Sequence, residues 1–192
     1  MEILVGGLII AVIAIAYVWY VVLVRRRNRA LEALSSIDVQ LRKRHDLLPN
    51  ILKLAERFMS HERELLTRVI ELRNEARKPY DPSNPEAVRQ HLEAEGGLQA
   101  GMRQLFALAE NYPELRSSQT VLEAQQSFAM VEGHIAAARR FYNSAVTELN
   151  NAAEIFPGSL IARQVGVQPL PFFELEDASL RRPLDASDYL AS

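Results

Sequence analysis

The chain of 192 residues contains no cysteine. Disulfides, thiolate metal sites, a cysteine nucleophile and a lipid-modified cysteine are therefore excluded. The sequence also lacks a glycine-rich nucleotide loop and a Gly-x-Ser-x-Gly stretch. No segment alternates apolar and polar residues in the manner typical of β-strands. These absences point away from the common enzyme classes and towards an all-helical protein.

The histidines do not complete a known metal-site pattern. Helical di-iron proteins use Glu-x-x-His pairs that project into the bundle. The residues three positions before His45, His61, His91 and His134 are Arg, Phe, Val and Val. The segment HEREL begins like the helix of a zinc protease, but Leu65 stands where the second histidine is needed. We therefore expect no metal, no cofactor, no small-molecule substrate and no catalytic residues.

One long apolar stretch stands out in this chain. Residues 3–24 carry no charged side chain, and roughly 20 apolar residues cross a bilayer core. Tyr17, Trp19 and Tyr20 cluster near its end, where aromatic rings favour the membrane interface. A cleaved signal peptide, the alternative, has a basic start and a shorter apolar run. We predict an uncleaved transmembrane anchor over residues 1–24.

Positive charge follows the apolar stretch immediately. Residues 25–29 read RRRNR; residues 25–78 carry a net charge of +6, and residues 79–192 carry −7. Because basic residues stay on the cytoplasmic side, we expect the N-terminus outside and the rest of the chain in the cytoplasm. The basic half would lie near anionic lipid headgroups, or form an ordinary solvated helix face. Bases interleaved with acids, without a recognition motif, predict no nucleic-acid binding.

Helical periodicity dominates the remainder. Apolar residues recur at steps of three, four and seven from Leu31 to Leu72, which predicts one amphipathic helix over residues 25–76. The pattern predicts further helices over 85–111, with Gly96-Gly97 as a weak point, over 118–156, and a short one over 159–167. Ser83 or Asn84 would cap the helix that starts at Pro85.

The expected fold is therefore all-α: an N-terminal transmembrane helix that continues into a long-helix, antiparallel three- to four-helix bundle. We assign the bundle to residues 25–176. Residues 168–177, QPLPFFELED, are expected to be extended or irregular, and residues 177–192 are expected to form a flexible acidic tail.

Polar residues interrupt the apolar pattern in IDVQLRKRHDLLPNI, residues 37–51. Arg44 or His45 fills the step between the apolar Leu41 and Leu48, and a polar side chain in a core layer needs a partner. We predict a buried polar layer made of five residues: Asp38, Arg44, His45, Asn143 and Asn150. Such layers fix helix register at some cost in stability, and a packing role is favoured over a ligand site. Pro49 should free the carbonyl of His45 for another donor.

Several stretches resemble one family. Residues 37–76, followed in order by NYPELRSS, VEGHIAAARRFYNSAV, FPGSLIAR and FFE, resemble the LemA family of bacterial membrane proteins over about residues 25–176. The resemblance implies a helical bundle on one N-terminal span in the cell envelope, with no established catalytic residues or cofactor. One branch of the family takes part in shaping magnetosome membranes. Two departures are Leu149-Asn150 in place of a second Tyr-Asn pair, and Val167 in place of an aromatic after Gly166.

Two functions fit these features. The first is a non-enzymatic scaffold or assembly protein in the bacterial inner membrane, which acts through the bundle surface or as a homo-oligomer. The alternative is an accessory subunit that presents its bundle and C-terminal segment to a membrane enzyme or protease. In that case Phe172 and Phe173 would anchor the protein partner. An enzyme centred on His45 is the least favoured hypothesis.

Overall fold

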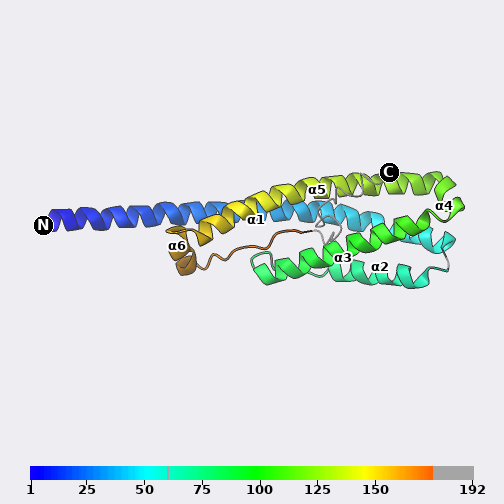
Figure 1. Cartoon of the computed structure of the whole chain (residues 1–192), viewed down its shortest axis with the longest axis horizontal. Coiled ribbons are helices and arrows are strands. Elements are labelled where there is room, and N and C mark those ends of the chain that lie inside the picture. The colour runs from blue at the N-terminus through cyan, green and yellow to red at the C-terminus, as the bar shows by residue number, and fades with distance from the viewer. Residues whose placement is uncertain (60, 175–192) are drawn as a thin grey trace, which may run out of the picture.

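A single helix, α1 (Glu2–Phe58), contains both the apolar stretch and the first part of the bundle. It has 57 residues, which corresponds to about 86 Å at about 1.5 Å per residue. Residues 1–18 are exposed almost throughout, whereas from Leu23 onward one face of the helix is buried. The N-terminal part of α1 therefore projects from the bundle as a free rod (Figure 1).

The computed structural model describes residues 1–59 and 61–174. After α1 the chain forms α2 (Arg63–Ala76), α3 (Pro85–Ala109), α4 (Pro113–Ser117), α5 (Gln119–Glu154) and α6 (Gly158–Val165). The described residues contain no strand, so the prediction of an all-α bundle is confirmed. The long helices α1, α2, α3 and α5 run alternately up and down the bundle (Figure 1).

The four long helices form two closely packed antiparallel pairs. Helix α1 lies along α5, and α2 lies along α3. One apolar cluster fills the end near the projecting rod, from Leu23 to Leu41 of α1, against α5 and α6. A second cluster fills the distal end, from Leu48 to Met59, against α2 and α3. Between the two clusters lies the segment of α1 that carries Arg44 and His45.

The prediction of one helix over residues 25–76 is wrong. Helix α1 ends at Phe58, and the chain reverses before α2 begins at Arg63. Residues 59–62 contain neither glycine nor proline, so the sequence carries no conventional stop signal there. The reversal buries Met59 completely and lets α2 pair with α3, a tertiary gain that periodicity within one helix does not reveal.

The glycines of α3 support packing instead of breaking the helix. Helix α3 is continuous through Gly96-Gly97, contrary to the weak point expected there. A methyl group on Gly97 would lie 3.4 Å from the side chain of Leu72 in α2, and one on Gly101 only 3.0 Å from it. Glycine at these positions therefore permits the close approach of α2 and α3. At the start of α3, the Asn84 side chain caps the helix by accepting from two backbone N–H groups.

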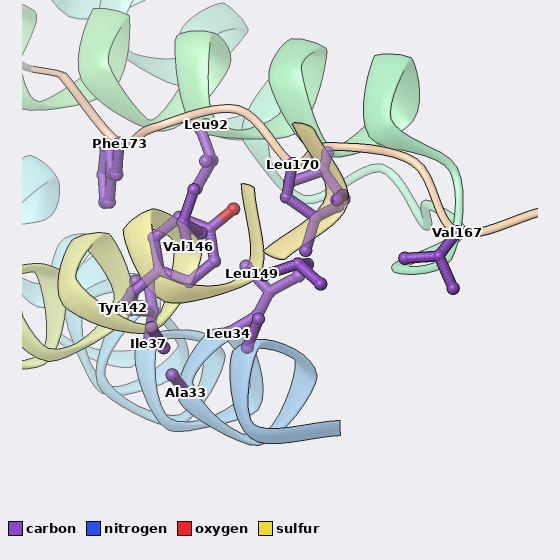
Figure 2. Packing of buried hydrophobic residues seen from close by; sticks show 14 of the residues in the cluster. Ala33, Leu34, Ile37, Leu92, Tyr142, Val146, Leu149, Val167, Leu170 and Phe173 are labelled. Atoms are coloured by element: carbon purple, nitrogen blue, oxygen red, sulfur yellow. The ribbon is translucent and has the colours of Figure 1, made fainter. Parts of the chain in front are cut away.

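The residues after α6 form an extended segment, residues 167–174, that packs back onto the bundle. Its residues Val167, Leu170 and Phe173 are buried in the cluster formed with α1 and α5 (Figure 2). The final residues of the predicted bundle, 175–176, and the predicted acidic tail, 177–192, lie outside the described residues.

Candidate functional site

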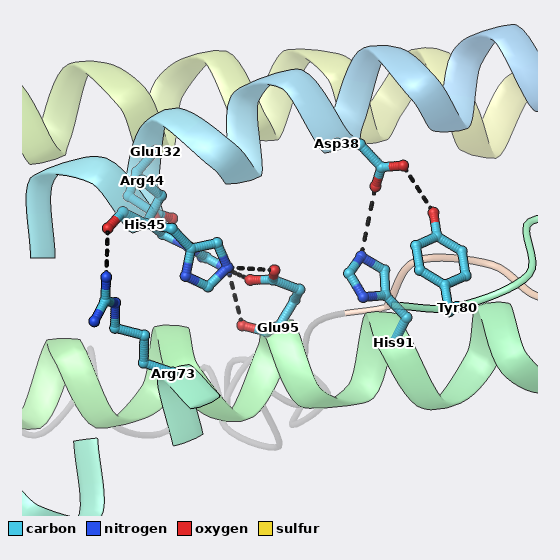
Figure 3. Close-up of polar contacts among 8 residues, drawn as sticks. All are labelled: Asp38, Arg44, His45, Arg73, Tyr80, His91, Glu95 and Glu132. Carbon is cyan, nitrogen blue, oxygen red and sulfur yellow. Dashed lines mark hydrogen bonds and ion pairs between the residues drawn. The ribbon is translucent and has the colours of Figure 1, made fainter. Parts of the chain in front are cut away.

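A buried ionic cluster connects the two helix pairs. Arg44 of α1 and Glu95 of α3 form an ion pair, and each side chain is only 1% exposed. The Arg44 guanidinium also donates to the Glu95 carbonyl at 3.1 Å and to the carboxylate of Glu132 in α5 at 3.1 Å. His45 Nε2 lies 2.7 Å from the second carboxylate oxygen of Glu95. The cluster thus joins α1, α3 and α5 in the interior (Figure 3).

The two carboxylates are held by several donors each. Burial by itself raises the pKa of Glu95, but the hydrogen bond with His45 and the charge of Arg44 outweigh it, so this pKa lies below its ordinary value. Glu95 is therefore ionised and only accepts hydrogen bonds, which makes His45 Nε2 the donor. Glu132 receives a second hydrogen bond, from Gln99 Nε2 at 2.5 Å.

Pro49 shapes the backbone beneath this cluster. Proline lacks an N–H group and removes the helical hydrogen bond to the residue four positions earlier, which is His45. Arg73 of α2 donates to that freed carbonyl at 3.5 Å (Figure 3). Helix α1 continues through Pro49, and α2 gains a polar contact with α1 at this level.

A smaller polar group lies nearer to the projecting rod. Asp38 accepts a hydrogen bond from the Tyr80 hydroxyl at 2.8 Å and lies 3.5 Å from His91 Nε2 of α3. The rings of Tyr80 and His91 stack with centroids 4.1 Å apart. Burial, reinforced by Asp38, raises the pKa of Tyr80 well above its ordinary value, so the phenol stays protonated and donates. His91 and Glu95 are one turn apart on α3, so both polar groups lie along one seam (Figure 3).

The structure separates the five residues expected to share one layer. Arg44 and His45 lie in the ionic cluster, and Asp38 lies in the smaller group. Asn143 and Asn150 lie elsewhere on α5, and their predicted pairing with α1 is corrected. Each asparagine instead pairs with a backbone amide unit of the extended segment: Asn143 with that of Phe173, and Asn150 with that of Leu170.

The side-chain amides explain the heptad spacing of the two asparagines. In both pairs the Oδ1 atom accepts from the backbone N–H at 2.9 Å, and the Nδ2 atom donates to the carbonyl of the same residue at 3.2 Å or 2.9 Å. The Tyr142 hydroxyl adds a fifth hydrogen bond to this segment by donating to the Pro171 carbonyl at 2.8 Å. The pairs are therefore a clamp for the extended segment.

The predicted partner anchors also separate. Phe173 is 3% exposed and belongs to the core, so it is unavailable to another protein. Phe172 is 44% exposed and remains accessible. Buried side chains recur at every third residue of the extended segment, at positions 167, 170 and 173, so Phe172 falls outside the buried set.

Sequence analysis missed Glu95 and Glu132, although a signal for Glu95 exists. Glu95 stands in the apolar stripe of α3, three positions after Leu92 and three before Leu98, both buried. This mirrors the position of Arg44 between Leu41 and Leu48 on α1. Opposite charges that interrupt two apolar stripes predict a buried ion pair once the helices are known to face each other. Among the described residues, no cluster of three or more His, Asp or Glu side chains is placed to hold a metal ion.

The N-terminal part of α1 is long and apolar enough to cross a membrane. The same helix continues into a bundle that contains buried ion pairs. Together these features define a membrane-associated helical-bundle protein. The chain belongs to the LemA family, whose profile matches residues 33–185.

Curated relatives are distant but cover most of the chain. Magnetosome protein MamQ of Magnetospirillum gryphiswaldense is 22% identical over 164 residues, which is 75% of this chain and 60% of that protein. Magnetosome protein MamQ 2 of Paramagnetospirillum magneticum is 23% identical with the same coverage. Protein LemA of Metamycoplasma hominis is 23% identical over 167 residues, 86% of this chain and 73% of that protein. The matched region thus spans about three fifths of the two magnetosome proteins.

Proposed function

We propose that this protein is a non-enzymatic scaffold or assembly protein of a bacterial envelope, anchored in the inner membrane by residues 3–24 with its bundle in the cytoplasm. The observation that carries the proposal is the continuity of α1. Its exposed apolar part, with Ile3 at 91% and Ile10 at 69% exposure, requires a non-aqueous surrounding, and the same helix is the spine of the bundle. The bundle is then a rigid continuation of the anchor.

The interior of the bundle suits a structural role. Every carboxylate of the ionic cluster is engaged by a cation or an amide, so the cluster fixes the register of the helices. The relatives named as magnetosome proteins support a role at a membrane structure. The proposal needs no substrate, cofactor or nucleic acid, and its partners are the bilayer and other protein chains.

Self-association through the span is part of this proposal. Gly7, Ala11 and Ala14 follow one another at steps of four and three, which puts them on one face of α1. A methyl group added to Gly7 would meet no atom within 4 Å, so this face is open in the single chain. Small residues at this spacing let membrane helices approach closely.

Particle mass tests the scaffold proposal. The full-length protein is crosslinked lightly in its membrane, extracted in mild detergent and weighed. A discrete homo-oligomer is expected; a monomer overturns self-association. Ala14→Ile should reduce the oligomer, because it adds bulk to the small-residue face. Ala16→Ile is the matched control, because it adds the same bulk about 200° around the helix at about 100° per residue.

One observation favours the alternative, an accessory subunit for a membrane enzyme or protease. Phe172 is a large, half-exposed ring on a segment held by hydrogen bonds from α5, and it is accessible as an anchor for a partner protein. A monomer that carries one stoichiometric partner in the same mass measurement, lost in Phe172→Ser, would establish this function instead. Orientation is tested separately: protease added to intact cells should leave the bundle uncut, and rapid digestion would reverse the topology.

A further inference from the structure

The turn that follows α5, together with α6, is called the α5–α6 corner. It lies at the end of the bundle from which the rod of α1 projects (Figure 1). Gly158, the first residue of α6, is in direct contact with the ring of Trp19: a methyl group at Gly158 would come within 2.9 Å of that ring. Leu23, one turn further along α1, is completely buried in the cluster that includes α6. The bundle therefore begins to pack on α1 before the apolar stretch has ended.

Helix geometry fixes the depth of this corner. From Ile3 to Trp19 the helix rises about 24 Å at about 1.5 Å per residue. The hydrocarbon core of a bilayer is about 30 Å thick. When residues 3–24 span the bilayer, Trp19 lies close to the boundary between acyl chains and headgroups. Gly158, which touches Trp19, must lie at the same level.

The outer surface of the corner is apolar. Ile155 is 59% exposed, Phe156 74% and Leu160 60%, whereas Gly158 and Ala162 face inward and are buried. Ile155 and Phe156 lie in the turn between α5 and α6, and Leu160 lies in the first turn of α6. Three large apolar side chains exposed together are uncommon on a surface that faces only water.

Charges around the corner match a lipid surface. Arg163 of α6 is exposed, and the arginines of residues 25–29 follow the span at the same end of the bundle. Arg26 holds α5 in place by donating to the Glu148 carbonyl at 2.7 Å. The acidic side chains at this end include Glu154, Glu148, which lies 3.5 Å from Arg29, and Asp81, whose pKa is lowered mainly by hydrogen bonds from Ser83 and also by the charge of Arg27.

We propose that the α5–α6 corner is a second membrane contact, in which Ile155, Phe156 and Leu160 enter the headgroup region of the bilayer that α1 spans. Amphipathic helices bind at this depth with an apolar face towards the acyl chains and basic groups among the headgroups. The inference rests on the proposed anchoring of α1. The bundle would then contact the membrane at two places, the span and the α5–α6 corner. The second contact would restrict tilting of the bundle about the span.

The absence of cysteine makes the test direct. Full-length Leu160→Cys protein is labelled with an environment-sensitive fluorophore and reconstituted into vesicles of phosphatidylcholine and phosphatidylglycerol. The matched control is Met130→Cys, which is 64% exposed in the wild type and lies 24 residues before Glu154 on α5, about 36 Å away at about 1.5 Å per residue. Spin-labelled lipid quenches probes in the bilayer, and iodide quenches probes in water.

The label at position 160 should be quenched severalfold more by the spin-labelled lipid than the label at position 130, and severalfold less by iodide. Equal iodide quenching at both positions overturns the proposal. Protection of position 160 from both quenchers also overturns it, because a second protein chain would then cover the corner. Trp19, the only tryptophan, reports the anchor itself through brominated lipids. A quenched Trp19 with an unquenched position 160 refutes the corner alone, and an unquenched Trp19 refutes the anchoring.

Discussion

Removal of the charge on Glu95 should weaken the bundle more than any exposed substitution. Glu95→Gln keeps the shape of the side chain but leaves Arg44, which is 1% exposed, with Glu132 as its sole carboxylate partner. Loss of one partner of a buried ion pair costs about 3–5 kcal/mol. Because Glu132 still compensates part of the charge, we expect the lower end, about 3 kcal/mol of unfolding free energy.

The assay is thermal unfolding of the full-length protein in mild detergent, followed by circular dichroism. For a chain of this size, about 1 kcal/mol corresponds to about 2–4 °C in Tm, so Glu95→Gln should lower Tm by about 6–12 °C. The control is Glu93→Gln, two residues away on the same helix, whose side chain is 59% exposed in its ion pair with Arg89. Solvent screens that pair, so its loss should change Tm far less.

A double substitution tests the same argument from the other side. Arg44→Met leaves Glu95 buried with His45 as its remaining side-chain partner, and should also destabilise the bundle. The double variant Arg44→Met/Glu95→Leu removes both buried charges and should cost less than the sum of the single changes. A Tm for Glu95→Gln equal to that of the control, or strictly additive effects in the cycle, would refute the claim that these charges compensate each other in the interior.

Three further predictions follow from the geometry. The folded pKa of Glu95 lies below its ordinary value near 4.5. The stabilisation of the fold by ionised Glu95 is therefore complete above about pH 4.5 and is lost as the pH falls through the folded pKa. The Tm difference between wild type and Glu95→Gln should stay constant from pH 7 to about pH 5 and shrink at lower pH. Asn143→Ala removes two hydrogen bonds of about 1 kcal/mol each and should speed amide exchange in the extended segment by about 30-fold, whereas the exposed neighbour Asn151→Ala should leave the exchange rate unchanged. Gly96→Ala meets no atom within 4 Å and should stabilise α3 by about 0.5–1 kcal/mol, whereas Gly101→Ala crowds α2 and should leave the protein less stable than Gly96→Ala in chemical denaturation.

The elements that sequence predicts well are those that local rules decide. The apolar run, the cap of α3 at Ser83 or Asn84 and the end of a helix before Pro157 depend on charge, capping and proline, all of which are visible in a short window. The helix predicted over 118–156 ends two residues earlier, at Glu154. The reversal at residues 59–62 is different, because no residue there forces the backbone to turn. The turn buries Met59 and lets α2 pack along α3, and this packing joins residues far apart in sequence.

The site shows the same division. The interruption of the apolar stripe at Arg44 and His45 marks both residues as unusual from the sequence alone. The partners of Arg44 and His45 depend on which helix faces α1 at that level. The prediction that Asn143 and Asn150 are these partners is therefore wrong, because Glu95 and Glu132 take that role. Both asparagines bind the backbone of the extended segment, which provides one donor and one acceptor at each contact. Backbone groups are the same for every residue, so the order of side chains does not reveal this contact.

The unbroken passage of α1 from the span into the bundle has a geometric consequence. Each residue of a helix is rotated by about 100° from the one before it. The face of the span that contacts a neighbour in the bilayer therefore determines how the whole bundle is rotated about the membrane normal. If spans associate through the face of Gly7 and Ala14, every bundle in the oligomer would have the same rotational orientation relative to its neighbours. Insertion of one residue between Ala14 and Trp19, before α1 meets α6, would rotate every bundle by about 100° relative to the span face and raise it by about 1.5 Å, which would reorient an entire assembly without altering any residue of the bundle.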